Sequence, residues 1–336
     1  MDASIVIPVR GRSDTIILAV ETLLHQAYKG EFEVIVVVDR SDSTHQALSQ
    51  TFDDDRLVLI SPSNLPTTGR DTNTRRRAGL RAARGDCLAL VDSDMSFGPD
   101  WLQTAIRLLD ENKVDCVAGV MLGLDDSFLS RYTDQNVLGA KTPRFAEPYL
   151  LTSSNFGKPN RKPGITANMV FTREVYQVVG GPVDFGFSYQ DYAFYQQIVD
   201  SGFSILCTNA LYGMHSHRAT IRELIWEYRT SGNGCAVFTR MFPESGLSRR
   251  RIAEVTAVSL LGLAAVVSFL LIPLFVVGAF LVGWFLLGIW TAIKLRSSEG
   301  FLYPIVTLFL GTCFSFGMLE GLISEQDALI RSYRRI

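Results

Sequence analysis

The chain lacks the features that mark several common classes of protein. Its 32 Lys and Arg and 34 Asp and Glu give a net charge of −2, so no basic excess is present to neutralise the phosphates of a nucleic acid. The five cysteines form no Cys-x-x-Cys pair, which is untypical of disulfide scaffolds and zinc ribbons. Residues 1–10 lack a basic start followed by an apolar stretch, so we expect no signal peptide. We therefore predict reduced thiols and no nucleic-acid partner.

Common nucleotide-binding and hydrolase motifs are missing as well. The turn after the first apolar run reads Arg10-Gly11-Arg12-Ser13, which is not the Gly-x-Gly-x-x-Gly of dinucleotide-binding folds. Neither Gly-x-x-x-x-Gly-Lys-Ser/Thr nor Gly-x-Ser-x-Gly occurs, which excludes a standard P-loop and the nucleophile elbow of α/β-hydrolases. Any nucleotide chemistry must therefore use other residues.

Strand-like and helix-like segments alternate along the first part of the chain. Short apolar, β-branched runs predict buried strands, and the stretches between them predict helices. The predicted strands cover residues 4–9, 33–38, 56–60, 87–91 and 114–121, and the predicted helices follow Ser13 and cover residues 72–83 and 101–112. This order predicts an α/β fold with a parallel sheet covered on both faces, in which ligands bind beyond the carboxyl ends of the strands.

Acidic residues follow two of these strands. Asp39 comes directly after the second apolar run, and Asp92-Ser93-Asp94 follows the fourth. Two carboxylates one residue apart suit Mg²⁺ or Mn²⁺, which prefer hard oxygen ligands and often share them with substrate phosphates. An isolated Asp-x-Asp is commonly a solvated loop, but the preceding strand and the second acidic site at Asp39 favour a metal site here.

The order of several motifs between Ser4 and Gly234 resembles that of family 2 glycosyltransferases. The resembling segments are Ile7-Pro8-Val9, Val36-Val37-Val38-Asp39-Arg40-Ser41, Arg75-Arg76-Arg77-Ala78-Gly79, Ala89-Leu90-Val91-Asp92-Ser93-Asp94, Gly180-Gly181-Pro182-Val183-Asp184 and Gln190-Asp191. Arg40 and Gln190 replace the family's usual glycine and glutamate, and only Arg76 and Gly79 match in the third segment. The resemblance implies the GT-A fold, a nucleotide-diphospho-sugar transferase fold with a Rossmann-like, mostly parallel sheet.

The resemblance also implies roles for individual residues. Asp191 would be the general base that takes a proton from the acceptor hydroxyl. The nucleotide-sugar, expected to be a UDP-sugar, would be bound by Pro8, Val9, Arg12, Asp39, Arg76, Asp92 and Ser93. The acceptor site would contain Gln190, Asp184 and Tyr189, and Mn²⁺ or Mg²⁺ would be held by Asp94, Asp92 and His215.

Structural alternatives stay open for these residues. Asp39 suits a helix cap or a turn, and Asp191 suits a cap for a helix over residues 192–199. His215 and His217 lie two positions apart on an extended segment, and we expect at most one of them to serve the metal, with a surface pair as the alternative. The basic helix over residues 72–83 could equally present a solvated face.

The C-terminal part of the chain is apolar. Residues 255–293 contain no charged side chain, a longer run than the ~30 Å core of a bilayer needs, and Pro273 divides it. We predict a cytosolic GT-A domain over residues 1–235, a basic juxtamembrane segment over 236–252, spans near 254–272, 274–293 and 301–321, and a basic tail over 324–336. Basic residues beside the first two spans place the catalytic part in the cytosol. Whether the third run crosses stays open, because crossing would put Arg331, Arg334 and Arg335 outside.

Together these features predict an integral protein of the inner or plasma membrane that acts in cell-envelope polysaccharide synthesis. We expect an inverting, metal-dependent transfer of a sugar to a lipid-linked or glycan acceptor at the cytosolic face. The absence of Gln-x-x-Arg-Trp favours transfer of a single sugar. Two alternatives stay open, namely a catalytically degenerate GT-A scaffold or nucleotide-sugar-binding protein, and a processive polysaccharide synthase. The sequence leaves the oligomeric state open.

Overall fold

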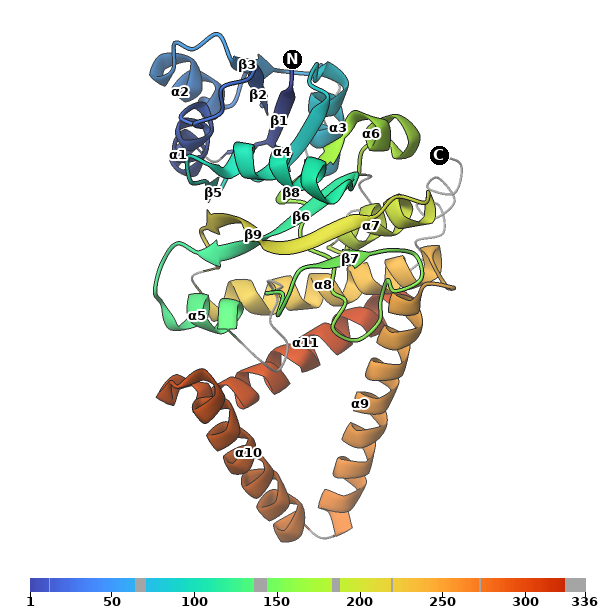
Figure 1. Ribbon diagram of the computed structural model, residues 1–336. Coiled ribbons are helices and arrows are strands. Elements are labelled where there is room, and N and C mark those ends of the chain that lie inside the picture. The colour runs from blue at the N-terminus through green and yellow to red at the C-terminus, as the bar shows by residue number, and fades with distance from the viewer. Residues whose placement is uncertain are drawn as a thin grey trace. The chain divides into compact units, whose positions relative to one another are not determined.

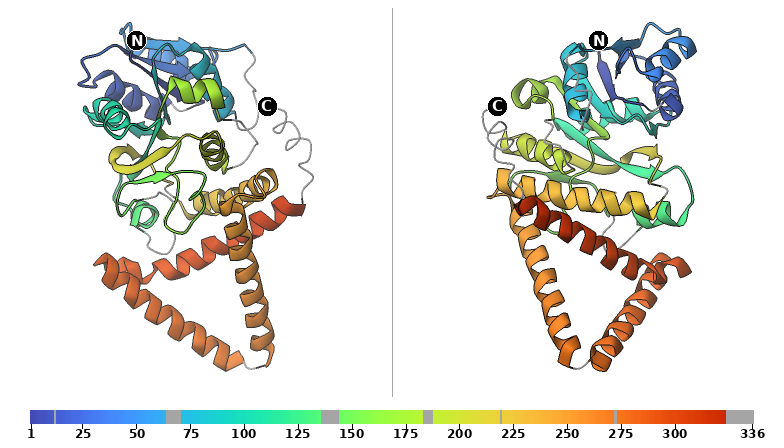
Figure 2. Two further views of the ribbon diagram at one scale, coloured as in Figure 1. Left: turned by 45° about the vertical axis from the view of Figure 1, so that its right-hand side comes forward. Right: turned by 180° about the vertical axis from the view of Figure 1, so that it is seen from behind.

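The chain divides into two units whose segments alternate along the sequence (Figures 1 and 2). The first unit comprises Met1–Leu124 and Thr142–Ser216, and the second comprises Asp125–Lys141 and His217–Ile336. The computed structural model describes residues 1–11, 13–63, 71–135, 144–182, 188–218, 220–271 and 273–323.

A nine-stranded sheet runs through the described part of the first unit, in the order β3-β2-β1-β4-β8-β6-β9-β5, with β7 paired to β9 (Figure 1). The strands are β1 Ala3–Pro8, β2 Phe32–Val37, β3 Leu57–Ile60, β4 Cys87–Val91, β5 Met95–Ser96, β6 Cys116–Gly123, β7 Tyr149–Leu151, β8 Asn168–Thr172 and β9 Ile205–His215. β3, β2, β1 and β4 pair in parallel, whereas β8 is antiparallel to both β4 and β6. The sheet is therefore mixed and mostly parallel, and the five strands predicted from the sequence are confirmed.

Helices cover both faces of this sheet. They are α1 Ser13–Leu24, α2 Ser43–Thr51, α3 Thr72–Ala82, α4 Trp101–Asn112, α6 Arg173–Val179 and α7 Gln190–Asp200. Ile5 and Ile7 of β1 belong to a core shared with α1 and α4. Val6 points to the other face, where Gly79 allows α3 to approach, since a Cβ atom on Gly79 would lie 2.4 Å from Val6 Cγ1. Both faces being covered explains why the central strands are continuous apolar runs.

A buried carboxylate connects the first strands of the sheet. Glu33 in β2 is 2 % exposed and accepts hydrogen bonds from Ser4 Oγ at 2.7 Å and from the backbone N–H and guanidinium of Arg84. Burial opposes ionisation of Glu33, but the hydrogen bonds from Arg84 and Ser4 outweigh it and hold the pKa of this carboxyl below its ordinary value. The three residues thereby tie β1 and β2 to the segment before β4.

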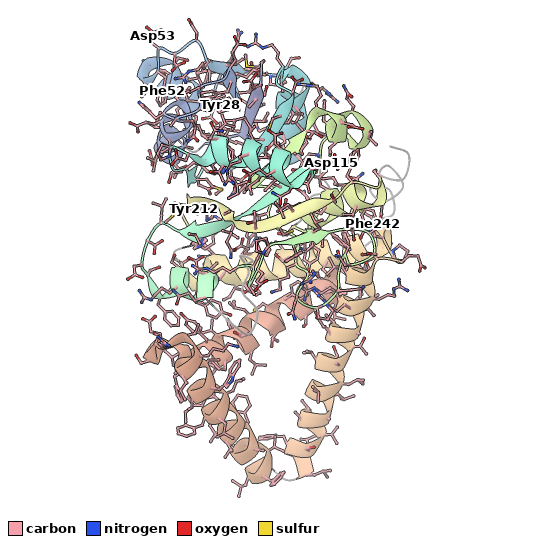
Figure 3. All side chains as sticks on the ribbon, in the orientation of Figure 1. Tyr28, Phe52, Asp53, Asp115, Tyr212 and Phe242 are labelled. Atoms are coloured by element: carbon pink, nitrogen blue, oxygen red, sulfur yellow. The ribbon has the colours of Figure 1, made fainter. Side chains whose placement is uncertain are left out.

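The second unit is helical in its described part. Its elements are α5 Phe128–Gln135, α8 Ile221–Met241, α9 Gly246–Leu271, α10 Pro273–Leu295, the 3₁₀ helix η1 Ser298–Phe301 and α11 Tyr303–Ile323. By length and composition, α9, α10 and α11 could each cross a membrane, and Figure 3 shows mainly carbon-coloured side chains along α9 and α10. The three predicted apolar runs are therefore helices, and the predicted break falls at Pro273, the first residue of α10. Residues 236–252 cover the end of α8, a short connection and the start of α9.

We expect Glu33→Ala to lower the melting temperature of the detergent-purified full-length protein. The change leaves the buried Ser4 hydroxyl and the Arg84 N–H with fewer partners, at a cost of about 2 kcal/mol, which corresponds to about 5 °C for a domain of this size. Because the folded-state pKa of Glu33 is lowered, its contribution is present above the unfolded pKa of about 4.3 and is lost as the pH falls through the folded-state pKa.

The control for this prediction is Glu31→Ala. The side chain of Glu31 is 80 % exposed, so this variant should melt like the wild type. The difference between Glu33→Ala and the wild type should also narrow below about pH 4. Equal losses in the two variants, or a difference that does not change with pH, would contradict the role given to Glu33.

Candidate active site

The carboxyl ends of β1, β2 and β4 bring the predicted nucleotide-binding residues to one edge of the sheet. β1 pairs in parallel with both β2 and β4. Pro8 and Val9, at the carboxyl end of β1, therefore lie between Asp39 and the Asp92-Ser93-Asp94 turn. Pro8 and Val9 are buried, and the backbone N–H of Val9 donates to the carbonyl of Val37 at 3.1 Å. Pro8 and Val9 can therefore form the base of a ligand-binding site at this edge of the sheet.

Asp39 is held by a buried arginine from α3. Arg75 is 1 % exposed, and its guanidinium lies 2.8 Å from both Asp39 Oδ2 and Asp71 Oδ2. The Nη1 atom of Arg75 has no hydrogen-bond partner among the described residues. Asp42 is the residue that caps α2, accepting from the N–H of Thr44 at 2.9 Å. Asp39 therefore does not cap α2. A third of its side chain is exposed beside Arg75.

Arg76 is the central residue of the site. It is 4 % exposed, and its Nη2 donates to Asp92 Oδ1 at 2.6 Å. Its Nη1 donates to Asn73 Oδ1 and to Thr166 Oγ1, each at 2.9 Å, and lies 3.8 Å from Asp191 Oδ1. The arginines at positions 75 and 76 of α3 therefore face the site and not the solvent.

Asp191 lies in the first turn of α7, where the helix dipole favours a negative charge. Its Oδ1 accepts a short hydrogen bond from Thr166 Oγ1, and 39 % of its side chain is exposed. Burial of the remaining surface raises the pKa of Asp191, while Arg76 and the Thr166 hydrogen bond partly offset the rise. An exposed carboxylate with a raised pKa, fixed by two neighbours, can accept a proton from a bound hydroxyl group.

Asp94 and His215 lie side by side because β5 pairs with the end of β9. Met95 pairs with His215 in this antiparallel ladder, and 3.5 Å separates Asp94 Oδ1 from His215 Nε2. No cluster of three or more His, Cys, Asp or Glu side chains within the described ranges could hold a metal ion. A carboxylate with an imidazole nevertheless suits Mn²⁺, and Mg²⁺ or Mn²⁺ commonly binds through one or two protein ligands together with substrate phosphates. The two residues therefore fit a site that a diphosphate completes.

The predicted acceptor residues begin α7. Tyr189 precedes the helix with a left-handed backbone, φ 74°, and its ring stacks on Tyr192 at 4.5 Å between centroids. Gln190 Oε1 accepts from Asn73 Nδ2 at 2.8 Å. A left-handed conformation at an aromatic residue is uncommon and is often found at functional sites. Arg12 and Asp184, also predicted here, lie outside the described residues.

His217 belongs to the second unit and has a different neighbour from His215. Its Nε2 is hydrogen-bonded to Asp134 Oδ1 at 2.9 Å, and both residues are buried. β9 ends at His215, and His217 follows it outside the strand. His215 is the one placed beside Asp94.

Four residues of the site are not identified by the sequence reasoning. Asn73 connects Arg76 to Gln190, and Thr166 connects Arg76 to Asp191. Asp71 and Arg75 form the support for Asp39. The spacing of Asn73 and Arg76 by three residues on one helix is a signal that could be used, whereas Thr166 is 90 residues from Arg76 and has none.

Comparison with known proteins identifies the family to which the chain is similar. A model described as glycosyl transferase family 2 matches residues 4–180. The chain is 33 % identical over 125 residues to the succinoglycan biosynthesis protein ExoO of Rhizobium meliloti, covering 37 % of this chain and 33 % of that protein. It is 30 % identical over 99 residues to the glucosyl-dolichyl phosphate glucuronosyltransferase of Haloferax volcanii, covering 30 % of each. The alignments thus span about a third of the length of these curated relatives.

A solved structure shares the fold over most of the chain. The mannosyltransferase PcManGT of Pyrobaculum calidifontis, in complex with GDP-Man and Mn²⁺, has a TM-score of 0.66 and 18 % sequence identity. The match covers 96 % of this chain and 87 % of that one. At this identity the likeness concerns the fold, which is the mixed sheet of the first unit followed by an apolar helical region.

We expect Arg76→Gln to destabilise the protein strongly. Removing the guanidinium leaves the oxygen atoms of Asp92, Asn73 and Thr166 without their hydrogen-bond donor, at a cost of about 3 kcal/mol, or close to 10 °C in melting temperature. Thermal melting in detergent measures the loss. The matched control is Arg81→Gln, an exposed residue of the same helix, which should change the melting temperature little. Similar melting of the two variants would remove Arg76 from its central position.

Proposed function

This chain belongs to glycosyl transferase family 2, and on that basis we propose that it moves a sugar from a nucleotide-diphosphate sugar to a lipid-linked or glycan acceptor, with inversion at the anomeric carbon. The observation that carries the proposal is the convergence of three groups at one edge of the GT-A sheet. These are Asp39 with Arg75, Asp94 with His215, and Asp191 with Arg76 and Thr166. The first group would bind the nucleobase, the second the diphosphate and the third the acceptor hydroxyl.

The donor occupies the carboxyl ends of β1, β2 and β4. Asp39 accepts a hydrogen bond from the nucleobase, and Arg75 keeps the carboxylate oriented through its contact at 2.8 Å. Asp94 and His215 would hold a divalent cation that the diphosphate of the donor also contacts, with Asp92 and Ser93 in the same turn. When bound, the cation stabilises the negative charge that develops on the departing nucleoside diphosphate. A UDP-sugar is the donor that the family resemblance implies, and the structural neighbour PcManGT was solved in complex with GDP-Man.

Asp191 acts as the general base. Its carboxylate takes the proton of the acceptor hydroxyl while the acceptor oxygen forms a bond to the anomeric carbon. The bond between that carbon and the diphosphate oxygen breaks, and the nucleoside diphosphate leaves. Because the oxygen attacks from the face opposite the leaving group, the anomeric configuration inverts. Thr166 and Arg76 position Asp191, and Gln190 and Tyr189 line the acceptor side at the start of α7.

A membrane-borne acceptor is supported by two observations. Three apolar helices follow the first unit, and one relative is named a glucosyl-dolichyl phosphate glucuronosyltransferase. We propose that the first unit carries out the transfer and that the second anchors it to the inner or plasma membrane, with the catalytic unit on the cytosolic side, in cell-envelope polysaccharide synthesis. The basic residues beside α9 and α10 support the cytosolic side.

Nucleotide binding should depend on metal and on Asp94. A ligand that binds only the folded state raises the melting temperature, by about 5 °C at one hundred times its Kd. We expect one of UDP, GDP or dTDP to give such a shift with Mn²⁺ and to lose it with EDTA. Asp94→Asn should lose the shift, whereas Asp100→Asn, an exposed residue after the same turn, should keep it. No shift with any nucleotide would contradict the proposed donor site.

Asp191→Asn should retain the metal-dependent nucleotide shift and lose transfer by at least about 100-fold, since a general base contributes 10²–10⁴. Transfer is measured as nucleoside diphosphate released from the donor sugar in the presence of a total membrane-lipid extract. Asp200→Asn, an exposed residue at the end of the same helix, is the matched control.

The pH dependence gives a second test of the same residue. The base must be deprotonated, so kcat/KM should fall as the pH drops through the pKa of Asp191, at a pH above the ordinary aspartate range because burial raises that pKa.

Full activity of Asp191→Asn would remove Asp191 from the base role. Nucleotide binding by the wild type with no turnover would instead favour a nucleotide-sugar-binding protein, and a ladder of product lengths would favour a processive synthase.

A further inference from the structure

Within the second unit, α11 packs against α8 at backbone distance. A Cβ atom built on Gly232 of α8 would lie 1.9 Å from the carbonyl oxygen of Phe314. A Cβ atom built on Gly317 of α11 would lie 2.0 Å from the carbonyl oxygen of Arg229. The two helices can approach this closely only because glycine stands at both positions, as at close helix–helix contacts in general.

Contacts with α8 and with α5 hold α11 along its length. In its first half, Tyr303 and Leu310 form a buried cluster with Leu224 of α8 and Tyr132 of α5, and Tyr132 Oη is hydrogen-bonded to Thr307 Oγ1 at 3.0 Å. In its last turn, Arg229 of α8 donates two hydrogen bonds to the carboxylate of Glu320, at 2.8 and 2.5 Å. The two helices run in the same direction and converge toward their C-terminal ends (Figures 1 and 2).

The composition of α8 fixes the depth of both helices. α8 has 21 residues, among which five are charged: Arg222, Glu223, Glu227, Arg229 and Arg240. A charged side chain at the centre of a bilayer costs about 2.5–3.5 kcal/mol on insertion scales, so α8 cannot lie in the hydrocarbon core. A helix of 21 residues that crossed the bilayer would span ~30 Å of depth and could not keep its contacts with both α5 and α8, which lie at its two ends. α11 must therefore share the depth of α8.

The face of α11 turned away from α8 is apolar and exposed. It carries Ile305, Leu308, Phe309, Leu319 and Ile323, and Phe309 and Leu308 are 50 % and 52 % exposed. Phe316 borders this face, and its ring contacts the guanidinium of Arg229 at 5.4 Å. The spacing of three and four residues within the apolar set defines one side of a helix. α11 follows α10 through η1 and so begins where a membrane-crossing helix ends. The partner that this face fits is accordingly the boundary between head groups and acyl chains of the same bilayer.

We propose that α9 and α10 are the membrane-spanning helices and that α11 lies in the plane of the interface, with α8 as its polar side and lipid on its apolar face. Two crossings return the chain to the side on which α8 lies. The basic residues Arg331, Arg334 and Arg335, which follow α11 in the sequence, then emerge on the same side as Arg249, Arg250 and Arg251 and satisfy the positive-inside rule. A third crossing would place them on opposite sides.

The number of crossings is tested with the full-length protein in sealed membrane vesicles. In vesicles whose orientation exposes an N-terminal epitope tag to protease, a C-terminal tag should be exposed as well. Leu274→Cys, at the start of α10, should react with a membrane-impermeant maleimide only after the vesicles are permeabilised. A C-terminal tag that is protected while the N-terminal tag is cleaved would establish a third crossing and overturn the proposal.

The depth of α11 is tested with a spin label. Thr312 is exposed near the middle of α11 and Leu263 is exposed near the middle of α9, so Thr312→Cys and Leu263→Cys, each with Cys313→Ala, form a matched pair. The label at 312 should lie about 5–10 Å below the head groups, and the label at 263 about 15 Å deep, near the bilayer centre. Equal depths would overturn the interfacial placement even if both tags lie on one side. Neither readout involves sugar transfer, so failure here is separate from failure of the proposed function.

Discussion

A buried guanidinium governs the geometry of the site. Arg76 extends from α3 under the ends of the strands and contacts side chains from three other segments of the chain. Asp92 follows β4, Thr166 precedes β8 and Asp191 lies in the first turn of α7. A charge that has lost its water must be surrounded by partners, because an unpaired buried charge is far more costly than a paired one. The position of Arg76 thus forces two carboxylates with different proposed roles to lie near each other.

Arg76 contacts the two carboxylates, Asp92 and Asp191, in different ways. Asp92 makes a direct pair with Arg76 at 2.6 Å, whereas Asp191 is 3.8 Å away and depends on Thr166 for its hydrogen bond. Burial consequently raises the pKa of Asp191 despite the nearby cation. A base with a raised pKa beside a fixed cation can accept a proton and remain oriented, which is what attack by an acceptor hydroxyl requires.

Desolvation of charge also decides the arrangement of the helical unit. By its own composition α11 could cross a bilayer. Its backbone contact with α8 at Gly232 and Gly317, and the pair between Arg229 and Glu320, join it to a helix that cannot enter hydrocarbon. The depth of an apolar helix is therefore set by the charges of its neighbour. Hydropathy is a property of one helix at a time and does not report the contact between α11 and the charged helix α8.

The strands of the parallel core, the break at Pro273 and the residues at the strand ends are predictable from the sequence, because they depend on local apolar runs and on backbone chemistry near one position. Asp39 and Asp94 are recognisable for that reason. The contact of Thr166 with the site, the antiparallel strand β8 and the contacts behind the depth proposed for α11 are visible only in the folded chain. Each depends on which distant segment lies alongside, and the free energy of pairing or desolvating two groups is defined only once both are in place.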